Sequence, residues 1–458
     1  MDVIVIGGGF AGLAAGIEAR LAGASVLLVE KMARPGGNSI ISDGCMNAAG
    51  TGLQKAQGLT DSVDLMYRDM LKAGQGLNSP VLAKAVAENS LETLEWTRDF
   101  LGVKFKDRVG HFGGHSLART HITQRVSGLD IIKPMVAKFQ GLGGNVSVKT
   151  LMRELCTKPG EGAVGVALQS GFSQKKGGQG DIYQVSADCG VVVATGGFGA
   201  DVDFRMVQDP RLGKRVDTTN KPSATAEGLK ALLKIGAAPL HLSHIQLGPW
   251  CSPDERYYGV APDFICYVSQ PYGIWLNTET GSRFVNELGD RAVRANAILA
   301  LEKPALALAD QAAVDKVGCD LSRALAKKVV GRFDSLAKLA QHYGVHQSSL
   351  EKSVRRYNGF QEQRQDPDFS KPILADSRPI EIPPFYAARI WPKVHHTMGG
   401  ARIDAKTRVL DLDGQPIPKL FAAGEVTGGV HGACRLGGNA ITECLCFGRI
   451  AGRMASSI

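Results

Sequence analysis

At 458 residues the chain is long enough for two or three domains with a buried cofactor between them. The hydrophobic fraction of 44% and the charged fraction of 21% are near globular averages, and no apolar run could cross a bilayer, so we expect a soluble protein without membrane insertion. The net charge of +9 comes from scattered Lys and Arg rather than from a basic stripe, which argues against nucleic acid as a partner and favours anionic substrates or an acidic redox partner.

The nine cysteines form no CxxC, CxxCH or zinc spacing. The sequence therefore predicts no haem, no iron–sulfur cluster, no metal site and no disulfide framework. The first strand is expected from Asp2, which leaves no room for a signal peptide, so we expect a cytoplasmic protein, or a periplasmic one if such a peptide has been removed.

The first 31 residues predict a strand, a glycine turn, an Ala-rich helix and a second strand that ends in Glu30. Gly7, Gly9 and Gly12 form GxGxxG directly between the strand and the helix. The first glycine permits the tight turn, the second lets the backbone approach a pyrophosphate, and the third lets helix pack on strand. The helix N-terminus attracts phosphates, and Glu30 can accept hydrogen bonds from a ribose. This unit predicts a dinucleotide site.

Further along the chain, residues 35–51 are predicted as a loop and residues 62–101 as helical. Short β-like segments from Asn145 onward indicate an antiparallel insertion that returns to a parallel strand. Residues 241–393 begin irregular and aromatic and become helical, which indicates an inserted second domain. A strand and turn at residues 419–429 and a closing helix from Asn439 complete the prediction.

NAD and FAD share the GxGxxG fingerprint, so the choice depends on the glycine-rich elements that follow it. These lie at residues 35–39, 194–199 and 422–425. Each alone is typical of an ordinary turn, but together they suit the repeated backbone contacts of a long cofactor and favour non-covalent FAD. Residues 435–440, RLGGNA, place a helix N-terminus late in the chain, where it can stabilise negative charge on a reduced flavin ring.

A family resemblance extends over nearly the whole chain. It is carried by the glycine-rich elements above, by RFVNE at 283–287, by VHHTMGGARID at 394–404 and by the long closing run AAGEVTGGVHGACRLGGNAITECLCFGRIAG. The sequence resembles the flavoprotein domain of soluble fumarate reductases of the flavocytochrome c type, relatives of the succinate dehydrogenase flavoprotein subunit. The resemblance implies an α/β fold, with a Rossmann-like FAD-binding domain and an inserted α+β capping domain that closes over the substrate. We expect the FAD-binding domain at residues 1–242 and 394–458 and the capping domain at residues 243–393.

The motifs and the resemblance together assign a set of residues to FAD binding. The set consists of Gly7, Gly9, Ala11, Gly12, Glu30, Lys31, Gly37, Asn38, Ser39, Asn47, Ala194, Thr195, Gly196, His396, Gly424, Glu425, Arg435, Gly438, Ala440 and Ile441.

The resemblance also implies three catalytic residues. His395 and Arg435 correspond to the family's substrate-binding histidine and to the arginine that binds a substrate carboxylate, a group that a planar guanidinium suits. Arg291 corresponds to the proton donor, a role accepted on resemblance because a free guanidinium is a poor acid. Nearby Arg294 is the competing candidate, and an exposed helical arginine is the simpler interpretation of either. In this scheme flavin N5 delivers hydride to the β carbon of a C=C bond and Arg291 protonates the α carbon.

The sequence departs from the family where a second substrate carboxylate is bound. The family's HPT-like stretch reads GPW here, with Gly248 in place of the histidine, and the family's Thr-Glu pair is replaced by residues such as Ile265, Cys266 and Ser269. Aromatic residues crowd this segment and indicate either core packing or a pocket wall for a bulkier, less polar β substituent. Asp263, Glu255 or a tyrosine remain candidates for the proton relay.

We therefore expect an FAD-dependent reductase of an α,β-unsaturated carboxylate other than fumarate. The alternatives are a dehydrogenase of the succinate or 3-ketosteroid type and a non-catalytic flavin electron carrier. Because the sequence has no haem motif, we expect an external electron donor: a cytochrome c, a flavoprotein or an NADH-linked partner.

Overall fold

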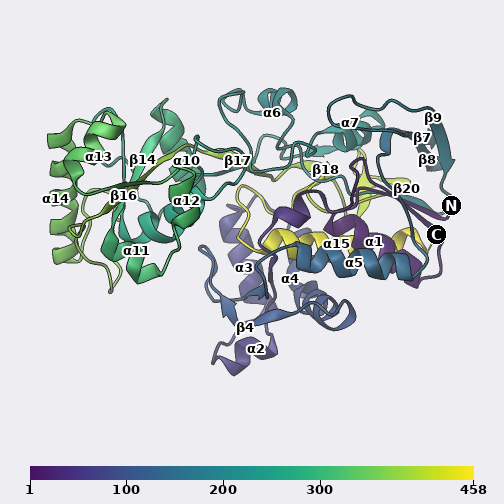
Figure 1. The fold of residues 1–458 in the computed structure, drawn as a ribbon. Helices are drawn as coiled ribbons and strands as arrows, with labels where there is room; N and C mark the ends of the chain where they lie inside the picture. The colour runs from purple at the N-terminus through teal and green to yellow at the C-terminus, as the bar shows by residue number, and fades with distance from the viewer. Residues whose placement is uncertain (458) are drawn as a thin grey trace. The chain divides into compact units, whose positions relative to one another are not determined.

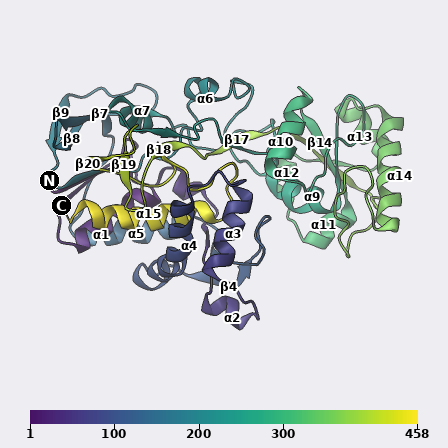
Figure 2. The same ribbon diagram turned by 180° about the vertical axis from the view of Figure 1, so that it is seen from behind.

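A computed structural model describes residues 1–457, and the chain divides into two compact units (Figures 1 and 2). Unit 1 comprises residues 1–210, 221–245 and 396–458, and unit 2 comprises residues 211–220 and 246–395. The chain leaves unit 1 within strand β12 (Ile245–Gly248) and returns to it within β17 (Lys393–Thr397). These two strands pair with each other.

The central sheet of unit 1 has six strands in the order β19-β20-β10-β1-β2-β6. Their bounds are β1 Val3–Ile6, β2 Val26–Val29, β6 Asn145–Ser147, β10 Gly190–Val193, β19 Arg408–Leu410 and β20 Pro416–Ala422. β1 is parallel to both β2 and β10, with Ile4 opposite Leu27 and Val191. β1, β2 and β10 are buried along their whole length, as continuous apolar runs in parallel sheets require. The predicted βαβ unit is confirmed.

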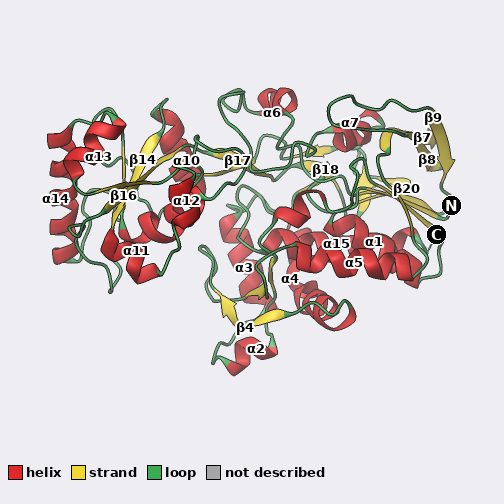
Figure 3. Ribbon diagram, in the orientation of Figure 1, coloured by secondary structure: helices red, strands yellow, loops and turns green. Residues whose placement is uncertain are grey.

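Helices cover one face of this sheet, and a second sheet contacts β10 and β20 (Figure 3). The helices are α1 (Phe10–Leu21), α5 (Leu129–Gly141) and α15 (Asn439–Ala455), and α1 packs against both of the others. A Cβ at Gly448 or Gly452 of α15 would lie 2.4 Å or 2.1 Å from a backbone oxygen of α1, so these glycines allow the two helices to approach closely.

The second sheet consists of β7 (Leu151–Lys158), β8 (Gly162–Gln169) and β9 (Ile182–Ser186). Its strands are antiparallel, and the chain passes from it into β10, which is parallel to β1. The predicted antiparallel insertion before a parallel strand is confirmed.

The remaining elements of unit 1 surround these layers. They are the 3₁₀ helix η1 (Gly37–Ile41), β3 (Cys45–Asn47), α2 (Gly52–Ala56), α3 (Val63–Ala73), α4 (Pro80–Glu95), the π-helical turn η2 (Trp96–Phe100), β4 (Phe105–Gly110), β5 (Thr120–Thr123), α6 (Val202–Gln208), α7 (Glu227–Lys234), β11 (Pro239–Leu240), β18 (Gly400–Arg402) and β21 (Thr427–Gly428). The segment predicted as a loop at residues 35–51 thus contains η1 and β3. The strand β3 forms because it pairs with β5, which is distant in sequence.

Unit 2 is built on an antiparallel sheet in the order β13-β14-β16-β15, with bounds Ile274–Leu276, Ala305–Asp310, Phe385–Ile390 and Gly331–Phe333. Alternate residues of the strands enter different cores, as the period of two requires. Leu306 and Leu308 pack with α13 (Leu336–Tyr343) and α14 (Gln347–Gln363). Ala305 and Ala307 pack in the other core, with Trp275.

The second core of unit 2 includes residues of five short helical elements. These are α8 (Ala261–Phe264), the π-helical turn η3 (Ile265–Ser269), α10 (Arg291–Ala300), α11 (Gln311–Val317) and α12 (Ser322–Ala326), and α9 (Gln270–Tyr272) follows η3. The helical character predicted for the later part of residues 241–393 is confirmed by α13 and α14. Over residues 1–457, no helix is both long enough and apolar enough to cross a membrane.

Candidate functional site

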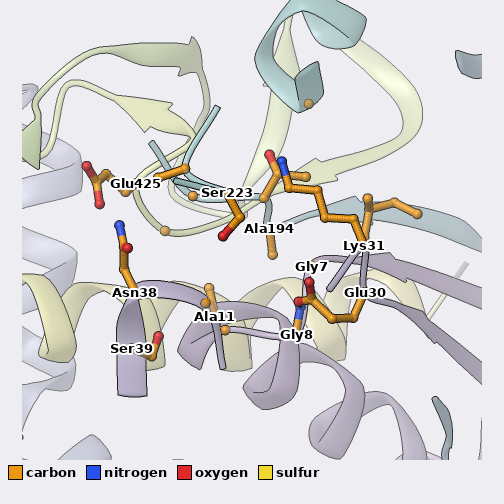
Figure 4. A pocket seen from close by; sticks show the side chains of 18 of the residues that line it. Gly7, Gly8, Ala11, Glu30, Lys31, Asn38, Ser39, Ala194, Ser223 and Glu425 are labelled. Carbon is orange, nitrogen blue, oxygen red and sulfur yellow. The ribbon is translucent and has the colours of Figure 1, made fainter. Parts of the chain in front are cut away.

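Unit 1 contains a cleft at the carboxyl ends of four sheet strands, with an empty volume of about 940 Å³ that includes space open to solvent. Residues directly after β1, β2, β10 and β20 contribute to its wall, which is where open α/β sheets bind ligands. The lining residues are 6–11, 29–31, 37–39, 150–152, 194–197, 223–224, 227–228, 423–425 and 444. Figure 4 shows Glu425 at one end and Glu30 with Lys31 at the other, so the cleft is elongated.

The glycine turn after β1 forms the floor of the cleft next to the N-terminus of α1. Gly7 has φ +106°, and a Cβ there would lie 2.3 Å from the carbonyl oxygen of Ala194, so only glycine fits. At Gly9 a Cβ would meet only the Ser39 hydroxyl, at 3.3 Å, and would otherwise project into the cleft. The first-turn N–H groups of α1 have no partners within the helix. This is a backbone cradle that can bind phosphate oxygens.

Glu30 and Lys31 lie at the end of β2. The Glu30 carboxylate accepts hydrogen bonds from the backbone N–H of Gly8 (3.0 Å) and of Met32 (2.8 Å), which holds it against the glycine turn. Burial raises the pKa of Glu30, against those hydrogen bonds. Lys31 donates to the hydroxyl of Thr225 at 2.6 Å and lies 3.1 Å from Glu227, so its ammonium group connects β2 to the start of α7.

At the other end of the cleft the carboxylate of Glu425 contacts β17. It accepts hydrogen bonds from the backbone N–H of Thr397 at 2.9 Å and from its hydroxyl at 3.2 Å, and it lies 3.4 Å from Nδ1 of His396. Burial raises the pKa of Glu425 to about 7, while the charge of Arg435 opposes that shift. Glu425 and His396 therefore form a buried pair, and the Glu425 carboxyl changes its protonation near neutral pH.

Three further buried groups lie beside this pair. The ring of His431 packs edge-on against that of His396 with centroids 5.6 Å apart, and its Nε2 is 4.0 Å from the Glu443 carboxyl. Burial lowers the pKa of His431 to about 3 and raises that of Glu443 to about 8. The contact between these two is thus one of neutral groups at pH 7, although their types suggest an ion pair. Arg435, 7% exposed, remains the permanent cation of this region.

The loop before α15 is held by Asn47, from β3. Its side-chain amide donates to the carbonyl of Gly437 and to the side chain of Asn439, both at 2.6 Å. His115 Nε2 lies 2.9 Å from the same carbonyl, and burial lowers the His115 pKa to about 4. Gly438, the N-cap of α15, has φ +82°. This network fixes the N-terminus of α15, which begins at Asn439, four residues after Arg435.

Comparison with known proteins agrees with this site. The family model described as the FAD binding domain matches residues 2–441. The chain is 39% identical to the acrylate reductase flavoprotein subunit of Shewanella woodyi, over 99% of this chain and 91% of that protein.

The chain belongs to the FAD-binding family of the soluble fumarate reductases. It is 36% identical to the fumarate reductase (cytochrome) of Shewanella frigidimarina, over 100% of this chain and 77% of that protein. The open conformation of a flavocytochrome c3 fumarate reductase superposes with a TM-score of 0.84 at 32% identity, covering 99% of this chain and 78% of that one. The predicted fold class, the FAD cofactor and the class of FAD-dependent oxidoreductase acting on CH–CH bonds are confirmed.

The cleft of this flavoprotein fits FAD on its own geometry: an elongated space, a glycine turn that a Cβ at Gly9 would narrow, and an acidic residue at the end of β2. Of the residues predicted to bind FAD, the following line it: Gly7, Gly9, Ala11, Glu30, Lys31, Gly37, Asn38, Ser39, Ala194, Thr195, Gly196, Gly424 and Glu425.

Other residues in that prediction lie outside the lining: Gly12, Asn47, His396, Arg435, Gly438, Ala440 and Ile441. Gly12 has a packing role, because a Cβ there would lie 1.8 Å from the carbonyl oxygen of Gly7. Sequence reasoning missed residues 150–152 after β6, Ser223 and Cys444, which line the cleft. None of these carries a glycine motif; only the position of residues 150–152 after a parallel strand could have indicated them.

Two of the three predicted catalytic residues, Arg291 and His395, belong to unit 2, and both contact Trp250. The Arg291 guanidinium lies 4.8 Å from the centre of the indole, and the ring of His395 lies edge-on to it with centroids 5.9 Å apart. The Thr219 hydroxyl is 2.9 Å from Nδ1 of His395 and orients that ring. The structure thus brings Arg291 and His395 to one aromatic side chain of this unit.

The competing arginine, Arg294, is 5% exposed and stacks over Trp275 at 5.5 Å. Burial lowers its pKa to about 10. Of the proton-relay candidates, Glu255 accepts hydrogen bonds from the backbone N–H groups of Val260 and Ala261. Its carboxylate therefore holds a loop closed. Burial raises the pKa of Asp263.

Proposed function

We propose that this flavoprotein reduces the C=C bond of an α,β-unsaturated monocarboxylate rather than fumarate. One observation carries the proposal: uncharged residues stand where the family resemblance implies a second carboxylate site, while Arg435 remains as a buried cation. Ile265 and Ser269 in that stretch are buried, and Trp250 has the apolar surface of an indole. The named relative from S. woodyi is an acrylate reductase flavoprotein subunit, which agrees with such a substrate.

We assign the substrate carboxylate to Arg435 and His395. A guanidinium presents a planar pair of donors that matches a carboxylate and stays charged at all relevant pH values. Arg435 lies just before the N-terminus of α15, whose partial positive charge also favours an anion. Holding the acid group in this way withdraws electrons from the conjugated double bond and prepares the β carbon for attack.

When bound and reduced, FAD supplies the hydride that the β carbon needs. Arg291 gives a proton to the α carbon, so that the substrate gains two hydrogens and becomes the saturated acid. Loss of that proton leaves Arg291 neutral until a relay restores it. Among the relay candidates, we favour Asp263 over Glu255, because backbone N–H groups already occupy the Glu255 carboxylate.

We propose that a separate protein delivers the electrons: a cytochrome c, a flavoprotein or an NADH-linked partner. The sequence has no CxxCH motif for a haem within the chain, and the S. woodyi relative is named as a subunit. The scattered positive charge, a net +9, suits an acidic surface on this donor.

The test is oxidation of reduced viologen by the FAD-loaded protein with fumarate, methacrylate, cinnamate and urocanate. We expect turnover with at least one monocarboxylate and a loss of about 10³-fold in kcat for Arg291→Ala with FAD retained. The matched control is Arg332→Ala, because Arg332 is an exposed arginine of β15. Turnover with none of the acids would favour a flavin electron carrier, and reduction of viologen by a saturated substrate would favour a dehydrogenase. Either result contradicts the proposal.

A further inference from the structure

Trp250 is the side chain of unit 2 that both Arg291 and His395 contact. The Arg291 guanidinium covers the indole face at 4.8 Å, and the His395 ring meets it at an interplanar angle of 73°. Trp250 is 8% exposed and packs with Cys251, Phe264 and other buried residues of its core. Its position is therefore fixed, and so is its contact with two residues that the proposed function uses.

The indole of Trp250 has one polar atom, and that atom has no partner in the described chain. Nε1 is buried, yet among residues 1–457 none accepts a hydrogen bond from it. Buried indole N–H groups usually find an acceptor, as Trp391 does in the carbonyl of Arg215 at 2.9 Å. Because this unsatisfied donor belongs to the indole that Arg291 and His395 contact, it points to an acceptor on a ligand.

Gly248 lies against the same edge of the indole and places no side chain there. A Cβ at Gly248 would lie 3.4 Å from Cε2 and 3.5 Å from Nε1 of Trp250. Any longer side chain at residue 248 would extend from a point already in contact with the indole N–H edge. The pair of a glycine and a tryptophan therefore replaces polar side chains with an aromatic surface that has a single N–H donor.

We propose that Trp250 is the residue that selects monocarboxylate substrates. The ring face opposite Arg291 contacts the β substituent of the acid, and Nε1–H donates a hydrogen bond to an oxygen of the same acid. A second carboxylate against that opposite face would lose its hydration and would meet an uncharged aromatic surface, which disfavours fumarate. This inference rests on the proposed function and adds the residue that sets the substrate class.

The test compares two variants of Trp250 in the FAD-loaded enzyme, by kcat and KM for cinnamate, methacrylate and fumarate. Trp250→Thr removes the ring, and we expect the ratio of kcat/KM for cinnamate to that for fumarate to fall by about 10-fold or more. Trp250→Phe keeps an apolar face without the donor, and we expect KM for every accepted acid to rise about 10-fold while the ratio between acids changes by less than about threefold.

Trp275→Phe is the matched control, because Trp275 is also buried in unit 2 with an Nε1 that has no partner within residues 1–457. It stacks with Arg294 instead of Arg291, so we expect unchanged KM and an unchanged ratio. An unchanged ratio in Trp250→Thr, or equal losses for all acids, would overturn the selection role, and an unchanged KM in Trp250→Phe would overturn the hydrogen bond. A wild-type enzyme inactive with every acid would instead remove the proposed function itself.

Discussion

The side-chain amide of Asn47 donates a hydrogen bond of 2.6 Å to the carbonyl of Gly437, across 390 positions of the sequence. Asn47 also accepts a hydrogen bond from the Thr120 hydroxyl at 2.7 Å, and it is fully buried. A short strand near the start of the chain thus fixes the loop that carries Arg435 and the start of α15. The position of the predicted carboxylate-binding residue depends on this contact.

Asn47→Ala is expected to lower the free energy of unfolding by about 1–3 kcal/mol, because it leaves the buried Thr120 hydroxyl and Gly437 carbonyl with fewer partners. The retained FAD should decrease as well. Thermal melting and the ratio of flavin to protein absorbance measure the two effects. Asn89→Ala is the control, since the side chain of Asn89 donates to the carbonyl of Ala85 within its own helix, at 2.8 Å. Equal effects of the two variants would contradict a specific role for Asn47.

Gly9→Ala is expected to weaken FAD binding by about 10-fold or more while leaving the stability of the FAD-free protein unchanged or slightly higher. The new methyl group would project into the cleft, where the backbone must approach the pyrophosphate. The backbone conformation of Gly9, φ −81°, suits alanine. Equilibrium titration of FAD-free protein with FAD measures the affinity. Gly52→Ala, at an open helix position, should change neither quantity. Unaltered affinity in Gly9→Ala would remove this glycine from the phosphate cradle.

The Glu443 carboxyl should make the FAD-free protein less stable as the pH rises. Its pKa in the folded state, about 8, lies above the ordinary value of 4.5, so the folded state holds the proton more tightly. The resulting stabilisation is complete below pH 4.5 and is lost as the pH rises to about 8.

Glu443→Gln should not show that loss. Its free energy of unfolding, relative to wild type, should therefore rise by about 2–3 kcal/mol between pH 5.5 and pH 7.5, at up to about 1.4 kcal/mol per pH unit for one group. Denaturant unfolding at several pH values measures it. His431, with its pKa lowered to about 3, acts in the opposite sense below pH 6.5 but equally in both proteins. Parallel pH profiles for the two proteins would show that Glu443 is ionised in the folded state.

Arg435→Lys should lower kcat/KM for unsaturated acids by about 10²-fold or more, mainly through KM, because a lysine cannot present two parallel donors to a carboxylate. Steady-state viologen oxidation measures it, with flavin absorbance as the check on cofactor retention. Arg20→Lys is the control: Arg20 donates to the backbone carbonyls of Leu142 and Ala24, and its replacement should leave kcat/KM within about twofold. A similar small effect at Arg435 would contradict its assignment.

Local sequence patterns predicted the parts of this fold that depend on neighbouring residues. The VIVI run, the glycine turn and Glu30 predicted the first βαβ unit, because parallel buried strands and tight turns impose strong local constraints. The helices α13 and α14 were predictable because a helical pattern also depends on residues that are close in sequence. The order of β10 after an antiparallel insertion also followed from strand-like segments in sequence.

Contacts between distant segments were not predictable. No local signal joins Asn47 to Gly437, and none marks Ser223 or Cys444 as part of the cleft wall. The segment 211–220, which belongs to unit 2, also carries no distinguishing composition. Sequence spacing indicated that the stretch around Cys266 lacks a carboxylate site, but not that it forms a π-helical turn. There burial raises the pKa of the Cys266 thiol to about 12.

The most direct test of enoate reduction is a single-turnover titration in which reduced flavin is the only source of electrons for the acid. The FAD-loaded protein is reduced under anaerobic conditions by light and a sacrificial electron donor, the light is switched off, and the protein is mixed with methacrylate, cinnamate or fumarate in separate experiments while flavin absorbance is followed. We predict that a monocarboxylate reoxidises the flavin fully at one equivalent, yields the saturated acid, and does so faster than fumarate. A flavin that stays reduced with all three acids, or that reacts fastest with fumarate, would contradict the account.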